Sequence, residues 1–77
     1  MYSIGMRQDL KVKFIGRDEY KAKIYIDNFG NKIFWFTNSN KLEDNSFVTI
    51  SAEIYSCVNG DKIEYYRIFN PKKKKGD

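Results

Sequence analysis

The sequence predicts an all-β protein, built as one small barrel of five strands. Apolar and polar residues alternate along most of the chain, which is the period of a half-buried strand. Turn residues interrupt this alternation at short, regular intervals, as in small barrels. With only 77 residues, 17% of them aromatic, the strands must share a single core.

The clearest element is a β-hairpin in the segment Ile24–Thr37. Two apolar, aromatic runs flank the turn sequence Asp27–Asn31, in which Gly30 supplies a position with φ > 0. The flanking runs are rich in Ile, Tyr, Phe and Trp, which suit strands better than helices. A three-residue loop that closes on this glycine fits best.

The other strands follow from the same alternation. Leu10, Val12 and Phe14 define the inner face of the first strand, and Val48–Ile54 alternates in the same way in the fourth. Asn38–Ser46 is a polar connection with Leu42 as its one apolar anchor. This connection is too short for a real helix. The predicted strands are Asp9–Ile15, Tyr20–Asp27, Lys32–Thr37, Phe47–Val58 and Lys62–Phe69, with turns at Gly16–Glu19 and Asn59–Asp61.

The lysines near the C-terminus account for most of the net charge of +4. Pro71 is expected to end the fifth strand, which leaves Met1–Asn70 as the domain and Pro71–Asp77 as a disordered, lysine-rich tail. The domain then holds ten basic and nine acidic residues, a net charge of +1. Any basic site on the domain must therefore come from local segregation of charge.

Barrel closure is expected because open edges of such aromatic strands would invite aggregation. The long fourth strand, the connection before it and the closing hairpin favour an OB-fold-like barrel. An SH3-like barrel is the alternative.

With these strands in place, the sequence resembles small OB-fold domains of phages and mobile elements. The shared pattern is a D-x-x-G-N turn, an aromatic strand with a central Trp, an alternating strand and a closing strand with an Arg. The segments that carry it are Asp27–Asn31, Phe34–Phe36, Leu42, Val48–Ile54 and Tyr66–Ile68. The resemblance extends roughly from Tyr20 to Asn70 and implies binding of single-stranded nucleic acid. Of the two possible ligands, we favour single-stranded DNA over RNA.

The location of such a site depends on which face of the hairpin is exposed. With an Asn28–Gly30 loop, Tyr25 pairs with Ile33 and Lys23 pairs with Trp35. We favour this register because it gives Trp35 a lysine neighbour; a four-residue loop would shift it by one and bury Trp35. The favoured register is expected to place Ala22, Ile24, Phe34 and Phe36 in the core, and Lys21, Lys23, Tyr25, Ile33 and Trp35 outside.

Exposed aromatic rings stack on bases and lysines follow the phosphates, so this outer face has the chemistry that single strands need. The competing interpretation is a core Trp35, solvated lysines, and Arg67 in an ion pair with Glu64 or Glu53. The predicted nucleic-acid-binding residues are Lys11, Lys13, Lys21, Lys23, Tyr25, Ile33, Trp35, Arg67, Lys72 and Lys73.

Catalysis has no support in the sequence. The chain has no His and no Gly-rich phosphate loop, and its single cysteine, Cys57, has no partner for a zinc site. We expect no enzyme activity, no cofactor and no metal. The second hypothesis is a protein-interaction module, such as a phage-type inhibitor that covers a host protein with exposed aromatics.

The lone cysteine and the absence of a signal-peptide pattern predict a cytoplasmic location. The longest apolar run, Ile33–Phe36, is too short to span a bilayer, so no membrane partner is expected. The oligomeric state stays open.

Overall fold

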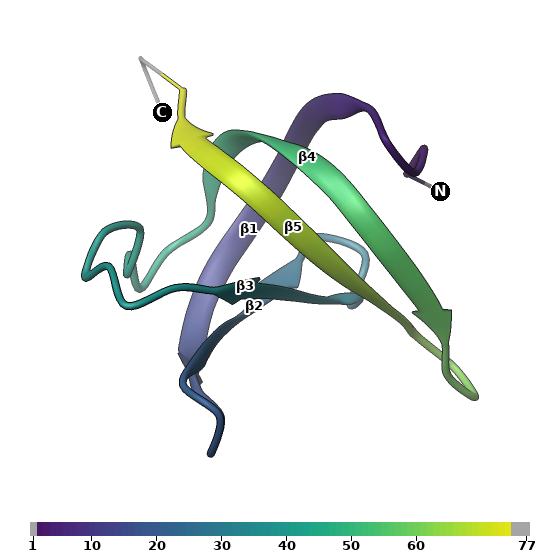
Figure 1. Ribbon diagram of the computed structural model, residues 1–77, viewed down its shortest axis with the longest axis horizontal. Helices are drawn as coiled ribbons and strands as arrows, with labels where there is room; N and C mark the ends of the chain where they lie inside the picture. The colour runs from purple at the N-terminus through teal and green to yellow at the C-terminus, as the bar shows by residue number, and fades with distance from the viewer. Residues whose placement is uncertain (1, 75–77) are drawn as a thin grey trace.

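Five strands and no helix make up the computed structural model, which describes residues 2–74 (Figure 1). The predicted all-β class is therefore confirmed. Each predicted strand has a counterpart, although the second and fifth start two residues later than expected. The strands are β1 (Arg7–Arg17), β2 (Ala22–Asp27), β3 (Lys32–Phe36), β4 (Val48–Asn59) and β5 (Glu64–Lys73).

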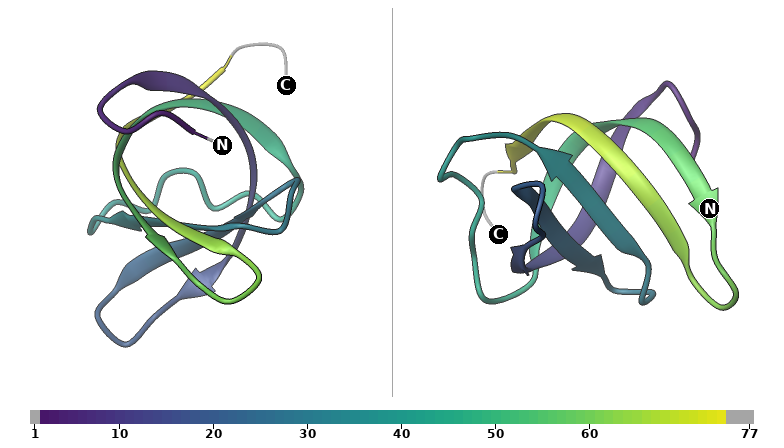
Figure 2. Two further views of the ribbon diagram at one scale, coloured as in Figure 1. Left: turned by 90° about the vertical axis from the view of Figure 1, so that its right-hand side faces the viewer. Right: turned by 60° about the horizontal axis from the view of Figure 1, so that its bottom comes forward.

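The strands close into a barrel in the order β1-β2-β3-β5-β4, with β4 returning to β1 (Figure 2). β3 runs parallel to β5, and every other neighbouring pair is antiparallel. This is an OB-fold-like barrel, as predicted. No helix long and apolar enough to cross a membrane occurs within residues 2–74.

The inner faces of β1 and β4 are confirmed. Leu10 and Val12 of β1 are buried, and Phe14 packs against the same core. The alternating residues of Val48–Ile54 that were expected inside are buried as well. β1 is long enough to pair with β4 through its first half and with β2 through its second half. It therefore closes the barrel.

A buried carboxylate organises the turn between β2 and β3. Asp27 Oδ1 accepts hydrogen bonds from the backbone N–H groups of Phe29 (2.9 Å) and Asn31 (2.8 Å). Its Oδ2 accepts one from the hydroxyl of Tyr2 (2.7 Å). Burial raises the pKa of the Tyr2 phenol, and the hydrogen bond to Asp27 raises it further. Gly30 has φ of 89°, as the three-residue loop requires.

The expected end of the fifth strand at Pro71 is wrong. β5 continues to Lys73, with Lys72 opposite Ser51 and Lys73 opposite Ile50 on β4. Proline is tolerated here because the ladder shifts between Ser51 and Glu53, where β5 carries one extra residue. Residues 71–74 are thus part of the barrel; the rest of the predicted tail, 75–77, lies outside the described residues.

A second irregularity lies further along the same ladder. Ile54 is opposite Ile68, but Ser56 is opposite Arg67, so here β4 carries the extra residue, Tyr55. Bulges redirect side chains at such positions. Tyr55 is 61% exposed on the outside of the barrel.

Gly30→Val should lower the free energy of unfolding by more than about 1 kcal/mol, because a β-branched residue resists φ > 0. A Cβ at Gly30 would meet no atom within 4 Å, so the backbone conformation alone causes the loss. Denaturant unfolding would measure it, with Gly30→Asn as the control that tolerates this conformation. Equal stability of Gly30→Val and the wild type would contradict the turn described here.

Ending the chain at Asn70 should destabilise the barrel by about 1–3 kcal/mol, at roughly 1 kcal/mol per hydrogen bond. The truncation removes the Pro71–Lys73 part of β5 and the bond from the Lys74 N–H to the Thr49 carbonyl (2.9 Å). Thermal and denaturant unfolding would measure the change.

The control for this truncation is Lys73→Ala/Lys74→Ala in the full chain. It keeps the backbone pairing and removes only two surface ion pairs, to Asp44 and Asp9, worth about 0–1 kcal/mol each. An unchanged melting temperature after truncation would show that β5 ends functionally at Asn70.

Candidate functional site

The predicted register of β2 on β3 is confirmed. Tyr25 lies opposite Ile33, and Lys23 lies opposite Trp35. The N–H of Asp27 donates to the carbonyl of Asn31 (3.0 Å), which closes the three-residue loop. The alternative four-residue loop is wrong.

The faces of this hairpin are nevertheless the reverse of those predicted. Lys23 and Ile33 are fully buried and Tyr25 is almost so, all three on the interior side of the barrel. Their placement on an outer binding face is therefore wrong, and they present no surface to a ligand.

The apolar residues that were expected to fill the barrel lie mostly on the other side. Ile24 and Phe34, opposite each other in the ladder, are only half-buried, and Phe36 is 48% exposed. Their predicted core position is wrong. Ala22 alone of this set is buried, as expected.

The connection between β3 and β4 explains why polar side chains can point inward. The Nζ of Lys23 donates to the carbonyl of Lys41 and lies 3.2 Å from a carboxylate oxygen of Glu43. The hydroxyl of Tyr25 donates to the carbonyl of Leu42 (2.7 Å). Burial raises the pKa of the Tyr25 phenol, and the nearby Glu43 carboxylate raises it further. Both side chains thus bury their stems and satisfy their polar ends.

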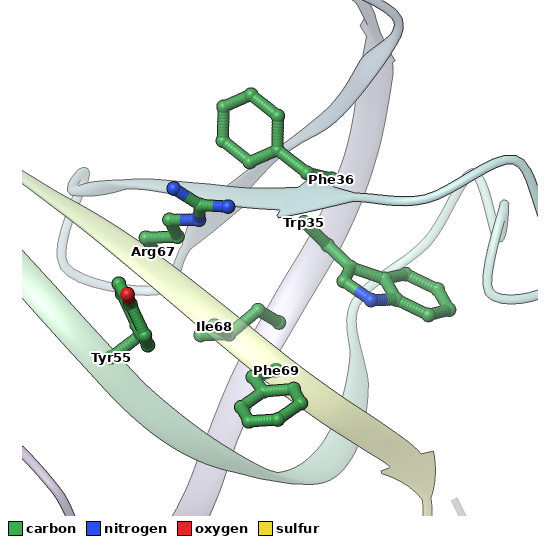
Figure 3. Close-up of a pocket in the computed structure, with 6 residues that line it drawn as sticks. All are labelled: Trp35, Phe36, Tyr55, Arg67, Ile68 and Phe69. Carbon is green, nitrogen blue, oxygen red and sulfur yellow. The ribbon is translucent and has the colours of Figure 1, made fainter.

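Trp35 lies next to Lys23, as predicted, but at the end of the barrel interior. It packs against the core, and the Nζ of Lys23 lies 5.1 Å from the centre of the indole. This cation–π contact is within the usual range of about 6 Å. Trp35 points away from Phe36, its neighbour on β3 (Figure 3).

The remaining predicted lysines do not gather around Trp35. Lys11 is exposed on β1, and Lys21 is exposed in the turn before β2. Lys13 places its Nζ 5.4 Å from the ring of Phe47. Lys72 and Lys73 are the last two residues of β5. Of the predicted cations within residues 2–74, Arg67 is the one that lies between two exposed aromatic rings.

These rings form a continuous surface over β3, β5 and β4, which we call the outer strip. Register joins its members, since Phe34 lies opposite Arg67 and stacks on Tyr65 at 6.1 Å between ring centres. Val58, opposite Tyr65, continues the apolar surface to the end of β4. The residues of the outer strip are Phe34, Phe36, Tyr55, Tyr65, Arg67 and Phe69.

Arg67 lies at the centre of the outer strip, between a ring from each neighbouring strand (Figure 3). Its guanidinium carbon is 4.3 Å from the centre of the Phe36 ring and 5.1 Å from that of Tyr55. The predicted alternative, an ion pair with Glu64 or Glu53, is wrong. Arg67 is exposed, and these ring contacts do not use the N–H hydrogens of the guanidinium, which carries five donors.

The donors of Arg67 meet no hydrogen-bond acceptor and no carboxylate within residues 2–74. The charge is therefore held in place by aromatic contacts alone. An exposed cation with a fixed, unoccupied fork of donors matches the geometry of a phosphate or a carboxylate.

The outer strip is hollowed on both sides of Arg67. β3 and β5 pair only from Lys32–Tyr65 to Phe34–Arg67 and then separate. A groove of about 180 Å³ lies where they separate, and a shallower hollow of about 300 Å³ adjoins it on the side of Phe34 and Val58. The first groove is lined by Trp35, Phe36, Tyr55, Arg67, Ile68 and Phe69.

Sequence reasoning missed most of the outer strip. Tyr55 and Phe69 occupy the polar phase of their strands, and both are exposed, at 61% and 49%. The sequence did carry a signal, because Tyr65, Arg67 and Phe69 alternate with the buried Tyr66 and Ile68. That alternation defines an aromatic outer row on β5.

Within residues 2–74, no group of three or more His, Cys, Asp or Glu side chains could hold a metal ion. The six residues of the outer strip supply aromatic rings and one guanidinium, and Asp18 adds a carboxylate to the lining of the hollow beside Phe34.

A comparison of the chain with known protein families, with curated proteins and with solved structures found no match.

Lys23→Glu should destabilise the barrel by about 3 kcal/mol or more, because it buries a carboxylate against Glu43 and the Lys41 carbonyl. Lys21→Glu, two residues earlier and exposed, should change stability by no more than about 0.5 kcal/mol. Urea unfolding of both variants would measure the difference. If both variants lost only a small and similar amount of unfolding free energy, Lys23 would have to lie on the outside of the barrel.

Proposed function

We propose that this protein binds single-stranded nucleic acid, with DNA favoured over RNA, on the outer strip of β3, β5 and β4. The observation that supports this most directly is the Arg67 guanidinium, stacked between Phe36 and Tyr55 with its donors free of partners within residues 2–74. The guanidinium can bind a phosphate group, and it is in contact with two rings that can stack on bases.

The exposed rings supply the base contacts. Phe36, Tyr55 and Phe69 come from three different strands and are each about half exposed or more. Every base has a π-face, so rings of this kind bind single strands with little preference for sequence. A duplex, whose bases are already stacked, would leave these rings without partners.

The outer strip shifts the binding surface away from the one expected from the sequence. The usual OB-fold platform is the face of the second and third strands. Here β3 contributes Phe34 and Phe36, whereas the outer face of β2 contributes Ile24 and Ile26, which are half-buried and aliphatic. The proposed site therefore extends from β3 toward β5 and β4.

The protein is proposed to act without catalysis or a cofactor, in the cytoplasm. The free thiol of Cys57 is in keeping with a reducing compartment.

A protein partner is the second candidate, and one observation favours it. The hollow beside Phe34 is lined mostly by apolar groups, and it continues to Val58, which is 65% exposed. An apolar surface of this kind also fits aromatic or aliphatic side chains of another protein. The two candidates differ in salt dependence, because only the nucleic acid releases counterions on binding.

Tyr55→Ala and Phe36→Ala should each weaken binding of fluorescent oligo-dT by about 1–3 kcal/mol, the usual contribution of one stacked ring. Phe29→Ala is the matched control, since this ring is 61% exposed but lies in the β2–β3 turn, outside the outer strip. Fluorescence anisotropy at several salt concentrations would measure the affinities.

Wild-type affinity for oligo-dT should fall steeply with salt, and duplex DNA of the same length should compete poorly. Absence of oligonucleotide binding at low salt would reject the proposal and leave the protein partner as the remaining candidate. If Phe29→Ala and Tyr55→Ala lost the same affinity for oligo-dT, binding would not be localised to the outer strip.

A further inference from the structure

A group of cations on the outer faces of β1, β4 and β5 continues the outer strip at its β5 end. Cross-strand register places these residues in successive rows over the three strands. One row is Arg7–Glu53–Phe69, the next is Asp9–Ser51–Lys72, and the third is Lys11–Thr49–Lys74. We call the four cations Arg7, Lys11, Lys72 and Lys74 the basic rows.

The first of these rows contains Phe69, a member of the outer strip. Because directly opposed residues share one face of a sheet, Phe69 and Lys72 both point outward, on either side of the Asn70–Pro71 bulge. The two surfaces are therefore continuous along β5. The distance along the strand from Arg67 to Lys72 is about 16 Å, at roughly 3.3 Å per residue.

The basic rows are fixed in position by the fold. The guanidinium of Arg7 donates to the carbonyl of Ser51 (2.8 Å) and to the carbonyl of Asn70 (2.7 Å), which holds it over the bulge. Lys74 is 3.0 Å from a carboxylate oxygen of Asp9. Neither Lys11 nor Lys72 forms an ion pair with any residue in the 2–74 range.

The two ends of β5 differ in the sign of their local charge. The turn from β4 to β5 carries Asp61, Lys62 and Glu64, so its charges nearly cancel, and it lies on the opposite side of the molecule from the end of β5 (Figure 1). The three rows at the other end hold the four cations and the carboxylates of Glu53 and Asp9, a net charge of +2. A polyanion bound on the outer strip is attracted toward the basic rows.

From this arrangement we infer that a single strand bound on the outer strip runs lengthwise along β5 and places its sugar-phosphate backbone on the basic rows. The inference rests on the proposed function and adds the path of the ligand. Bases stack on Phe36, Tyr55 and Phe69, Arg67 holds the phosphate between them, and the next phosphates reach Lys72 and Lys11. The strand therefore crosses the Asn70–Pro71 bulge.

The test compares two charge-reversal pairs that change net charge equally. Lys11→Glu/Lys72→Glu lies in the basic rows, whereas the control Lys41→Glu/Lys62→Glu changes two exposed lysines in the β3–β4 connection and the β4–β5 turn. Affinities are measured by anisotropy with oligo-dT of about 4 and about 16 nucleotides, the range of OB-fold site sizes.

The basic-row pair should lose at least tenfold in affinity for the long oligonucleotide. It should also lower the slope of log K against log salt by about 1.4, from two lost contacts at roughly 0.7 each. The short oligonucleotide, which the outer strip alone can hold, should lose less. The control pair should lose clearly less affinity for the long one.

If both double variants lost the same affinity for the long oligonucleotide, net charge alone would explain the effect and the proposed path would be wrong. Unchanged binding in the basic-row pair, when Tyr55→Ala does weaken binding, would also overturn the proposed path. If the wild type binds no oligonucleotide, the proposed function itself fails. Lys11→Gln/Lys72→Gln, which adds no carboxylate, replaces the first pair if thermal unfolding shows that reversal disturbs the barrel.

Discussion

The inward position of Lys23 and Tyr25 is the arrangement on which the rest of this structure depends. An ammonium group or a phenol can enter a barrel only if its polar end finds partners there. The β3–β4 connection supplies those partners through two backbone carbonyls and the Glu43 carboxylate. The β3–β4 connection thus works as a polar lining for one end of the core.

The inward orientation of Lys23 and Tyr25 also determines which side chains of the β2–β3 hairpin lie on the outside of the barrel. Side chains of a strand alternate with a period of two, so burying Lys23 and Tyr25 also turns Asp27 inward and Phe34 and Phe36 outward. Asp27 then anchors the turn and the N-terminal Tyr2. Phe34 and Phe36 meet Tyr65 and Arg67 across the parallel β3–β5 pair. The inner polar contacts and the outer aromatic surface are two sides of the same hairpin.

Local pattern was enough to predict most of the fold. Alternation located the strands, and Gly30 identified the turn that fixes the β2–β3 register. The face was not predictable from the hairpin, because β3 is apolar on both sides and β2 offers aliphatic residues on one side and amphipathic ones on the other. The deciding groups, Lys41–Glu43, lie far along the chain and act largely through backbone carbonyls. No residue type signals such a contact. The passage of β5 through Pro71 was missed for a similar reason, since it depends on a bulge set by the partner strand.

The two irregularities of the β4–β5 ladder have opposite signs. Near Pro71 the additional residue is on β5, and near Tyr55 it is on β4, so the offset opened by the first is closed by the second. The pairs from Asn59–Glu64 to Ser56–Arg67 and from Ser51–Lys72 to Ile50–Lys73 therefore share one alignment, and only Ile54–Ile68 and Glu53–Phe69 between them are displaced. Each extra residue is unpaired, so loss of one residue at either bulge would make the ladder regular there and keep the same partners on both sides of it. In homologous chains we therefore expect single deletions at these two positions to occur independently of each other.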